Sequence, residues 1–354
     1  MTTTRPFSDT PAIRAAISVA ERGQGLQEAA AHAAMLEMLG GTTDPVLTEA
    51  LLVALRDKGE SAPELAGAVR ALRDTMQRVD HSDPGSLVDT CGTGGGTVTT
   101  LNISTAAAFV VAGAGIPVAK HGNRSFTSRS GSADVLEAMG VSIDATPAQS
   151  GRILREVGIA FLFAPTHHPA MRHVAAVRRK LGTPTIMNLV GPLANPAGAT
   201  RQVIGVADPR RGALMATTLA HLGARHAMVV HGVEGLDEIA PMGETMIWEV
   251  RGGDVRQWTM SADTLGFRVD SLAGLAGGEP AENAAAIVQL FERPRGAPPA
   301  VRAAVVLNAG AAILVSGKAE SMEDAVEMAH AALDSGRALA TLEDLRSASV
   351  STSE

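Results

Sequence analysis

A run of four glycines within five residues most constrains how this 354-residue chain can fold. The run, Gly92-Thr93-Gly94-Gly95-Gly96, follows the short apolar segment Leu87-Val88 and precedes an apolar segment that begins near Asn102. Clustered glycines let backbone N–H groups converge on one point, and a helix N-terminus attracts negative charge. The segment therefore predicts a strand, an anion-binding loop and a helix, as in an α/β domain, with an ordinary flexible turn as the alternative.

The pattern of apolar residues differs on the two sides of the polar turn cluster at residues 81–86. Residues 11–79 place apolar side chains at helical spacing without strand-like alternation, and the basic amphipathic stretch at 169–181 is also helical in pattern. We expect a small all-helical domain over residues 1–80, completed by about 167–198. The remaining residues, 86–166 and 199–350, predict a larger α/β domain with a mainly parallel central sheet.

The second half of the chain continues the α/β pattern. It predicts a strand at 203–206, a helix at 212–222 and a strand at 226–230. Segments 246–250 and 255–260 flank Gly252-Gly253, which favours a β-hairpin. Two helices, 299–315 and 322–339, are expected to close the fold.

A second polar cluster follows the buried strand expected at 116–119. It runs from Lys120 to Ser132 and contains Lys120, Arg124 and Arg129 among small hydroxyl residues. Polar residues after a parallel strand emerge at its carboxyl end, where open α/β sheets bind ligands. The cluster predicts a receptor for a polyanion, and a solvated polar loop is the alternative.

A third cluster, Gly235-Leu236-Asp237-Glu238, follows the strand expected at 226–230. Adjacent carboxylates beside substrate phosphates suit hydrated magnesium, although ordinary surface charge gives the same pattern. Residues His167, His168 and His173 lack convincing zinc spacing. Cys91 is expected to be a small buried residue rather than a nucleophile.

Composition excludes several classes of protein. The net charge of -7 and the absence of Tyr disfavour a nucleic-acid or anionic membrane surface. The single cysteine fits a reducing compartment, and charged residues interrupt every candidate signal-peptide core near the N-terminus. The apolar stretch 105–119, taken as the longest, is too short for a bilayer. We expect a cytoplasmic protein.

Several motifs in order resemble the anthranilate phosphoribosyltransferase family, over nearly the whole chain. They include Gly92-Thr93-Gly94-Gly95, Asn102-Ile103-Ser104-Thr105, Lys120-His121-Gly122-Asn123-Arg124, Leu181-Gly182-Thr183, Asn188 with Gly191-Pro192-Leu193, and Gly235-Leu236-Asp237-Glu238. The resemblance implies a fold related to nucleoside phosphorylases, with the site in a cleft between the domains, and a homodimer built through the helical domain. It also implies transfer of the phosphoribosyl group from 5-phosphoribosyl 1-pyrophosphate (PRPP) to anthranilate, the second step of tryptophan biosynthesis from chorismate.

The same resemblance implies roles for individual residues. Lys120 and Arg178 would be catalytic, and Ser104, Asp237 and Glu238 would meet Mg²⁺. The anthranilate-binding residues would be Gly92, His121, Asn123 and Arg178. The PRPP-binding residues would be Gly92, Gly95, Gly96, Thr100, Asn102, Ile103, Ser104, Thr105, Lys120, His121, Gly122, Asn123, Arg124, Ser125, Phe126, Thr127, Ser128 and Ser132.

One departure from the family and three alternative functions remain open at this point. The family loop usually continues with Asp-Gly where this chain has Gly96-Thr97, so a polar contact to PRPP is in question. A nucleoside phosphorylase would share both domains, and a nonenzymatic relative that binds nucleic acid would need a basic groove. A dehydrogenase would need glycine where Thr97 ends the GxGxxG pattern.

Overall fold

The structure, a computed structural model, describes residues 10–96, 98–125, 129–233 and 235–350. The chain divides into two compact units. One comprises Met1–Gln77 with His167–Pro196, and the other comprises Arg78–Thr166 with Ala197–Glu354. The chain therefore leaves the first unit after its first helices and returns to it once.

The first unit is all-helical. Helix α4 begins with a capping box in which Ser61 and Glu64 pair reciprocally, and Glu64 also accepts hydrogen bonds from Leu26 N (2.8 Å) and Lys58 Nζ (2.7 Å). Gly67 lets α4 pack directly on α2, since a Cβ at this position would lie 2.5 Å from Glu28 O. The helices of this unit are α1 (Pro11–Glu21), α2 (Glu28–Leu39), α3 (Pro45–Lys58), α4 (Ala62–Thr75), α9 (Arg172–Leu181) and α10 (Met187–Val190).

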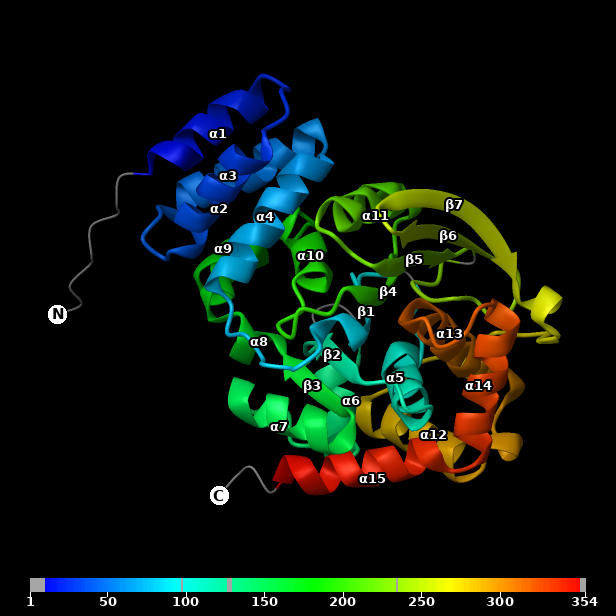
Figure 1. The fold of residues 1–354 in the computed structure, drawn as a ribbon. Coiled ribbons are helices and arrows are strands. Elements are labelled where there is room, and N and C mark those ends of the chain that lie inside the picture. Colours follow the sequence, from blue (N-terminus) through cyan, green and yellow to red (C-terminus); the bar gives the residue numbers. More distant parts are fainter. Residues whose placement is uncertain (1–9, 97, 126–128, 234, 351–354) are drawn as a thin grey trace. The chain divides into compact units, whose positions relative to one another are not determined.

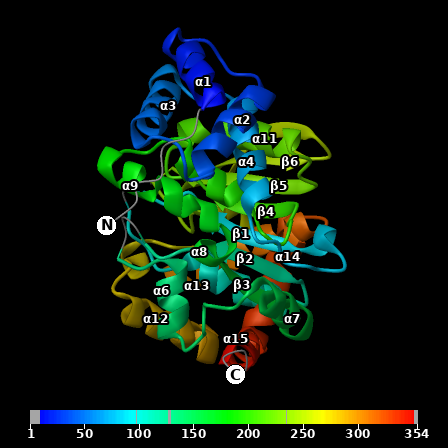
Figure 2. The ribbon, with the colours of Figure 1, turned by 90° about the vertical axis from the view of Figure 1, so that its left-hand side faces the viewer.

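The second unit is built on a seven-stranded sheet with the order β3-β2-β1-β4-β5-β6-β7. Strands β1 to β5 are parallel, whereas β6 and β7 continue the sheet as an antiparallel hairpin. Figure 2 shows β3 to β6 stacked in this order. The strands are β1 (Val88–Gly92), β2 (Val118–Gly122), β3 (Ile159–Phe163), β4 (Arg201–Gly205), β5 (His226–Gly232), β6 (Glu244–Arg251) and β7 (Asp254–Ser261).

Helices cover both faces of this sheet (Figure 1). The steps from β1 to β2 and from β4 to β5 run in opposite directions, so right-handed crossovers place α5 (Ile103–Gly113) and α11 (Gly212–His221) on opposite faces. Helix α13 (Pro299–Ser316) packs beside α5 and against β1, β4 and β5. The other helices are α6 (Ser132–Ala138), α7 (Pro147–Val157), α8 (Ala164–His167), α12 (Pro280–Glu292), α14 (Met322–Asp334) and α15 (Arg337–Val350).

The expected α/β fold class is confirmed, with two corrections to its elements. The segment 322–339 was expected to be one helix, but α14 ends at Asp334 and α15 begins at Arg337, because Gly336 adopts a left-handed φ of 79°. The longest apolar helix is α13 rather than the stretch 105–119. Within the described part of the chain α13 alone is long and apolar enough to cross a bilayer, and 78% of it is buried inside the fold.

Gly67→Ala is expected to destabilise the helical unit by about 1–3 kcal/mol, because the added methyl group meets backbone atoms that cannot move independently. Thermal melting followed by circular dichroism measures the loss. Gly25→Ala is the matched control, since a Cβ at Gly25 meets nothing within 4 Å and its φ lies outside the left-handed region. Equal melting temperatures for the two variants would contradict the close packing of α2 on α4.

Candidate active site

The glycine loop lies where the strand order of the sheet reverses. β1 and β4 are neighbours, and their last residues, Gly92 and Gly205, are paired in register. Thr93 N also donates a hydrogen bond to Gly205 O (2.9 Å). The chain then turns through Gly94 (φ 64°) and Gly95 (φ 80°), which other residues would adopt at a cost. Open α/β sheets bind ligands outside the carboxyl ends of their strands at such a reversal.

Lys120 places a buried ammonium group beside this loop. Its side chain on β2 is 3% exposed, and its Nζ donates to Thr90 O (2.5 Å) and Ser104 Oγ (3.4 Å). Burial lowers the pKa of Lys120, and the negative charges of Asp89 and Glu238 act in the opposite direction. Ser104 lies in the first turn of α5, so Lys120 connects β1, β2 and this helix.

Asp89 supplies the buried counter-charge. It is 0% exposed, and its carboxylate accepts hydrogen bonds from His121 N (3.1 Å) and Gln202 Nε2 (3.4 Å). A charge pair inside a core persists only where hydrogen bonds satisfy both partners, as they do here. Burial and the neighbouring Asp89 raise the pKa of the Cys91 thiol well above its ordinary value, so the thiol stays protonated. Cys91 is only partly buried, which differs from the expected buried residue, but a protonated thiol agrees with the prediction that it is not a nucleophile.

The carboxylates of Asp237 and Glu238 lie against the same loop. A Cβ built on Gly92 would be 3.5 Å from Asp237 Oδ2, and one built on Gly96 would be 3.6 Å from Asp237 Oδ1. Glu238 Oε1 accepts a hydrogen bond from Ser104 N (3.1 Å). Burial raises the pKa of Asp237, and burial together with Asp237 raises the pKa of Glu238 to about 8.

These carboxylates fit magnesium. Their raised pKa values indicate negative charge that neighbouring cations do not fully balance, which a divalent cation would correct. In the described ranges no three His, Cys, Asp or Glu side chains converge on one point. Magnesium is commonly held by one or two carboxylates together with water and substrate phosphates, so two carboxylates beside a phosphate loop suffice.

The loop after β2 is organised by α6. Asp134 Oδ2 accepts from Gly131 N (2.8 Å) and Ser125 N (3.0 Å), and Asp134 Oδ1 accepts from Arg124 (3.0 Å). Burial alone would raise the pKa of Asp134, but these hydrogen bonds lower it. Arg124 also pairs with Glu137 and lies over the ring of Phe163, 5.8 Å from its centroid. The Arg124 guanidinium is therefore already engaged with α6 carboxylates in this structure.

The other sequence-predicted residues occupy varied positions in this unit. Ile103 and Thr105 are 1% exposed, whereas Thr100 forms an antiparallel bridge with Ala276. Gly122 ends β2 close to the Oγ of Ser132, and Asn123 Oδ1 accepts from Arg124 N (2.8 Å). Asn102 lies at the start of α5. Predicted residues Phe126, Thr127 and Ser128, and the variant position Thr97, lie outside the described residues.

Arg178 belongs to the helical unit. It lies on α9, is half-buried, and burial lowers its pKa. Among the described residues none accepts a hydrogen bond from its guanidinium. A half-buried guanidinium without such an acceptor suits a carboxylate ligand, which it can bind through two parallel hydrogen bonds.

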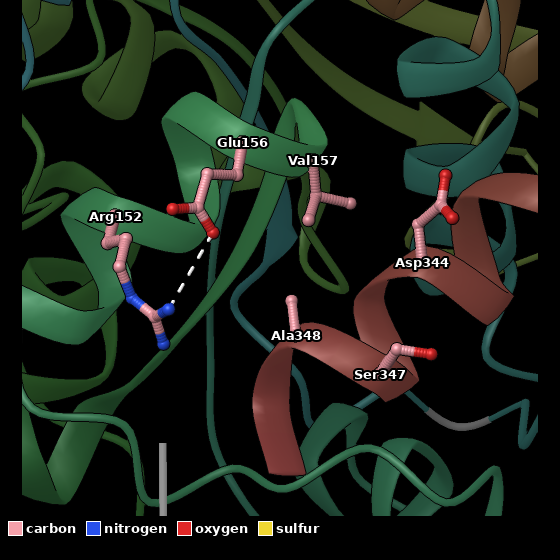
Figure 3. Close-up of a pocket in the computed structure, with 6 residues that line it drawn as sticks. All are labelled: Arg152, Glu156, Val157, Asp344, Ser347 and Ala348. Atoms are coloured by element: carbon pink, nitrogen blue, oxygen red, sulfur yellow. Dashed lines mark ion pairs between the residues drawn. The ribbon is translucent and has the colours of Figure 1, made fainter. Parts of the chain in front are cut away.

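Sequence reasoning missed residues that support the site rather than form it. Asp89 was not predicted, although it stands directly before the glycine loop as a lone carboxylate in an apolar strand. Gln202 is far from its partner Asp89 in sequence and gave no local signal. Asp134 lies three residues after Gly131 in a capping box, a local signal that the sequence analysis did not use. Figure 3 shows a separate depression between α7 and α15, with an ion pair between Arg152 and Glu156 at 3.8 Å. None of the predicted site residues lines it.

Comparisons with known proteins agree with this arrangement. Residues 84–339 match the family model described as the glycosyl transferase family a/b domain, and residues 15–76 match its helical bundle domain. The chain is 49% identical to anthranilate phosphoribosyltransferase of Rubrobacter xylanophilus over 332 residues, covering 94% of this chain and 96% of the relative.

Solved structures give the same result. The crystal structure of anthranilate phosphoribosyltransferase from Thermus thermophilus is 42% identical, with a TM-score of 0.87 over 94% of this chain and 98% of that one. The Saccharomyces cerevisiae enzyme in complex with PRPP and Mg is 25% identical, with a TM-score of 0.86 over 97% and 99% of the two chains.

Asp89→Asn is expected to move the alkaline limit of turnover to lower pH. The substitution removes the largest influence that opposes burial, so the pKa of Lys120 falls further and its charge is lost sooner as pH rises. A pH profile of kcat/KM measures the shift. Asp144→Asn, which removes the same charge from an exposed position, is the control. An unchanged alkaline limb in Asp89→Asn would contradict the assigned charge balance.

Proposed function

The chain belongs to the anthranilate phosphoribosyltransferase family and transfers the phosphoribosyl group of PRPP to anthranilate, and we propose that this transfer takes place at the cluster around Lys120. The products are N-(5-phosphoribosyl)anthranilate and pyrophosphate, in tryptophan biosynthesis. The observation that carries the proposed placement is a buried ammonium group between a glycine loop and two carboxylates, at the reversal of strand order.

Lys120 stabilises the leaving pyrophosphate in this proposal. Breaking the bond between the ribose carbon and pyrophosphate builds positive charge on the sugar and negative charge on the departing group. A preorganised ammonium group at low exposure stabilises the departing charge strongly, because no water has to reorient. Thr90 O and Ser104 Oγ hold Nζ in place, and the loop amides from Gly92 to Gly96 are suited to the phosphate oxygens.

Asp237 and Glu238 would hold Mg²⁺. When bound, the ion neutralises pyrophosphate oxygens and so makes pyrophosphate a better leaving group. Glu238 is oriented for this role by Ser104 N, and Asp237 faces the glycines of the loop. With Gly96 in place of the family's aspartate, these two residues provide the carboxylate charge at the loop, and backbone amides at Gly96 remain available to phosphate.

Anthranilate needs a carboxylate partner and alignment rather than a strong base. Its aromatic amine is largely neutral at pH 7, so the lone pair is already exposed. We assign the carboxylate to Arg178, and the other contacts of anthranilate to Gly92, His121 and Asn123. Holding the amine at near-attack distance from the ribose contributes several kcal/mol to lowering the barrier.

We also propose that the protein acts as a homodimer in the cytoplasm. The family resemblance supports a dimer built through the helical unit. A single cysteine, Cys91, cannot form an internal disulfide, which supports a reducing compartment.

Anthranilate fluorescence tests the reaction directly. The signal is expected to decay when enzyme, PRPP and Mg²⁺ are all present and to stay constant when any one is omitted. Thymidine phosphorolysis, assayed in parallel, separates this function from that of a nucleoside phosphorylase. Phosphorolysis without PRPP-dependent decay would contradict the reaction.

Arg178→Ala is expected to raise the KM for anthranilate about 10- to 100-fold, since a charge-assisted hydrogen bond contributes about 1.5–3 kcal/mol. The KM for PRPP is expected to stay within about twofold, because PRPP keeps its own contacts. Arg179→Ala, at the exposed neighbouring position on α9, is the control and should leave both constants unchanged. Equal losses for both substrates would show that Arg178 does not bind the carboxylate.

Metal affinity is expected to rise with pH through the titration of Glu238. With a pKa of about 8, the carboxylate form increases about fivefold between pH 7 and pH 8, and only this form binds Mg²⁺. Titration with Mn²⁺ as a paramagnetic substitute, in the absence of PRPP, measures the change. Glu238→Gln should weaken binding and flatten the dependence. A wild-type affinity that is constant from pH 6.5 to 9 would rule out Glu238 as the controlling ligand.

A further inference from the structure

Asn283 is a buried polar residue that the reaction described above does not use. It lies in the first turns of α12, is 3% exposed, and is 181 residues away from its partner Asn102 in sequence. Its Nδ2 donates to Asn102 Oδ1 (2.9 Å), and its Oδ1 accepts from Gly278 N (2.8 Å). Both ends of its amide are therefore satisfied.

Two backbone groups determine which way these amides point. Gly278 N can only donate, so it must face the oxygen of Asn283 rather than the nitrogen. This turns Asn283 Nδ2 toward Asn102 and requires Asn102 to present its oxygen. Asn102 Nδ2 then faces Ser130 O (3.1 Å), a carbonyl that can only accept. Every donor in this hydrogen-bond network meets an acceptor in only one orientation of the Asn283 and Asn102 amides.

The oxygen of Asn102 is fully used in this arrangement. It accepts from Asn283 Nδ2 (2.9 Å) and from Ser130 Oγ (3.1 Å), which occupy both of its lone pairs. The side chain makes no hydrogen bond to cap α5, although asparagine at such a position commonly does. Asn102 Nδ2 keeps a second N–H, for which no acceptor exists among the described residues.

The segment that carries Asn283 also fixes the backbone before Asn102. Leu101 N donates to Leu275 O (2.9 Å), and Gly277 N donates to Thr99 O (3.1 Å). Gly277 permits this approach, since a Cβ there would lie 2.3 Å from Thr100 O. Residues 275–283 therefore hold both the backbone path at residues 99–101 and the orientation of the Asn102 side-chain amide.

We propose that Asn283 is a positioning residue for PRPP: it fixes the Asn102 amide so that an N–H, and not the oxygen, remains available to PRPP. This inference rests on the proposed function, in which the glycine loop and the adjoining start of α5 bind PRPP. An amide turned the other way would present an oxygen to the phosphate oxygens and repel them. Asn283 itself touches no reacting atom.

Asn283→Asp tests the assignment at nearly constant shape. The introduced carboxylate still accepts from Gly278 N, but when ionised it cannot donate to Asn102 Oδ1. We expect the KM for PRPP to rise at least tenfold at pH 8, with the KM for anthranilate within twofold. Lowering the pH protonates the new carboxyl group and restores a donor, so the PRPP defect, relative to wild type at the same pH, should shrink toward pH 5.5.

Leu290→Ala is the matched control on the same helix. Leu290 is 0% exposed and lies in the apolar core of α12, so its truncation destabilises the helix without changing the amide network. Even if Leu290→Ala lowers the melting temperature as much as Asn283→Asp does, it should leave the KM for PRPP near that of wild type. An equal, pH-independent rise in both variants would overturn the positioning role, as would an unchanged KM for PRPP in Asn283→Asp.

Ser130→Ala gives a second test in case Asn283→Asp does not fold. It removes the other donor to Asn102 Oδ1 and should raise the KM for PRPP by a smaller factor, about threefold. No change in this variant, with Asn283→Asp unfolded, would count against the network. A wild-type protein without PRPP-dependent loss of anthranilate would instead overturn the proposed function, and this assignment with it.

Discussion

The buried ammonium group of Lys120 is the constraint on which the rest of the site depends. A charge inside a core requires hydrogen-bond acceptors and opposite charge within a few ångströms. Thr90 O and Ser104 Oγ provide the acceptors, and Asp89 on β1 provides the negative charge. Because Asp89 is itself held by His121 N and Gln202 Nε2, three parallel strands contribute to keeping one cation in place. The ammonium group is thus held in place by the protein alone.

The reversal of strand order explains why residues so distant in sequence serve one site. β1 and β4 end side by side, which leaves a place where no helix crosses directly above the strand ends. The glycine loop leaves from β1, and the backbone of Asp237 packs so closely on Gly205 of β4 that a Cβ there would lie 1.7 Å from Asp237 O. The loop amides proposed to bind phosphate and the carboxylates proposed to bind Mg²⁺ thereby meet without requiring a larger side-chain cluster.

The sequence predicted what is carried by local chemistry and missed what depends on packing. The two kinds of domain, the β-hairpin at Gly252-Gly253 and the mainly parallel sheet follow from periodicity and glycine positions, and the structure confirms them. The break at Gly336 was missed, because one glycine inside an apolar periodic stretch is a weak local signal. Asn283 was missed because its role exists only through Gly278 N and Asn102 Oδ1, contacts that no local pattern encodes. The roles of the site residues, Arg178 among them, stay predictions.

A crystal structure of the protein with PRPP and Mg²⁺ tests the central claim most directly. The account predicts pyrophosphate density against the loop at Gly92 to Gly96 with Lys120 Nζ in hydrogen-bond range. It also predicts a metal ion bound by Asp237 or Glu238 on the pyrophosphate side. Pyrophosphate bound elsewhere on the α/β unit, with Lys120 still donating only to Thr90 and Ser104, would contradict it.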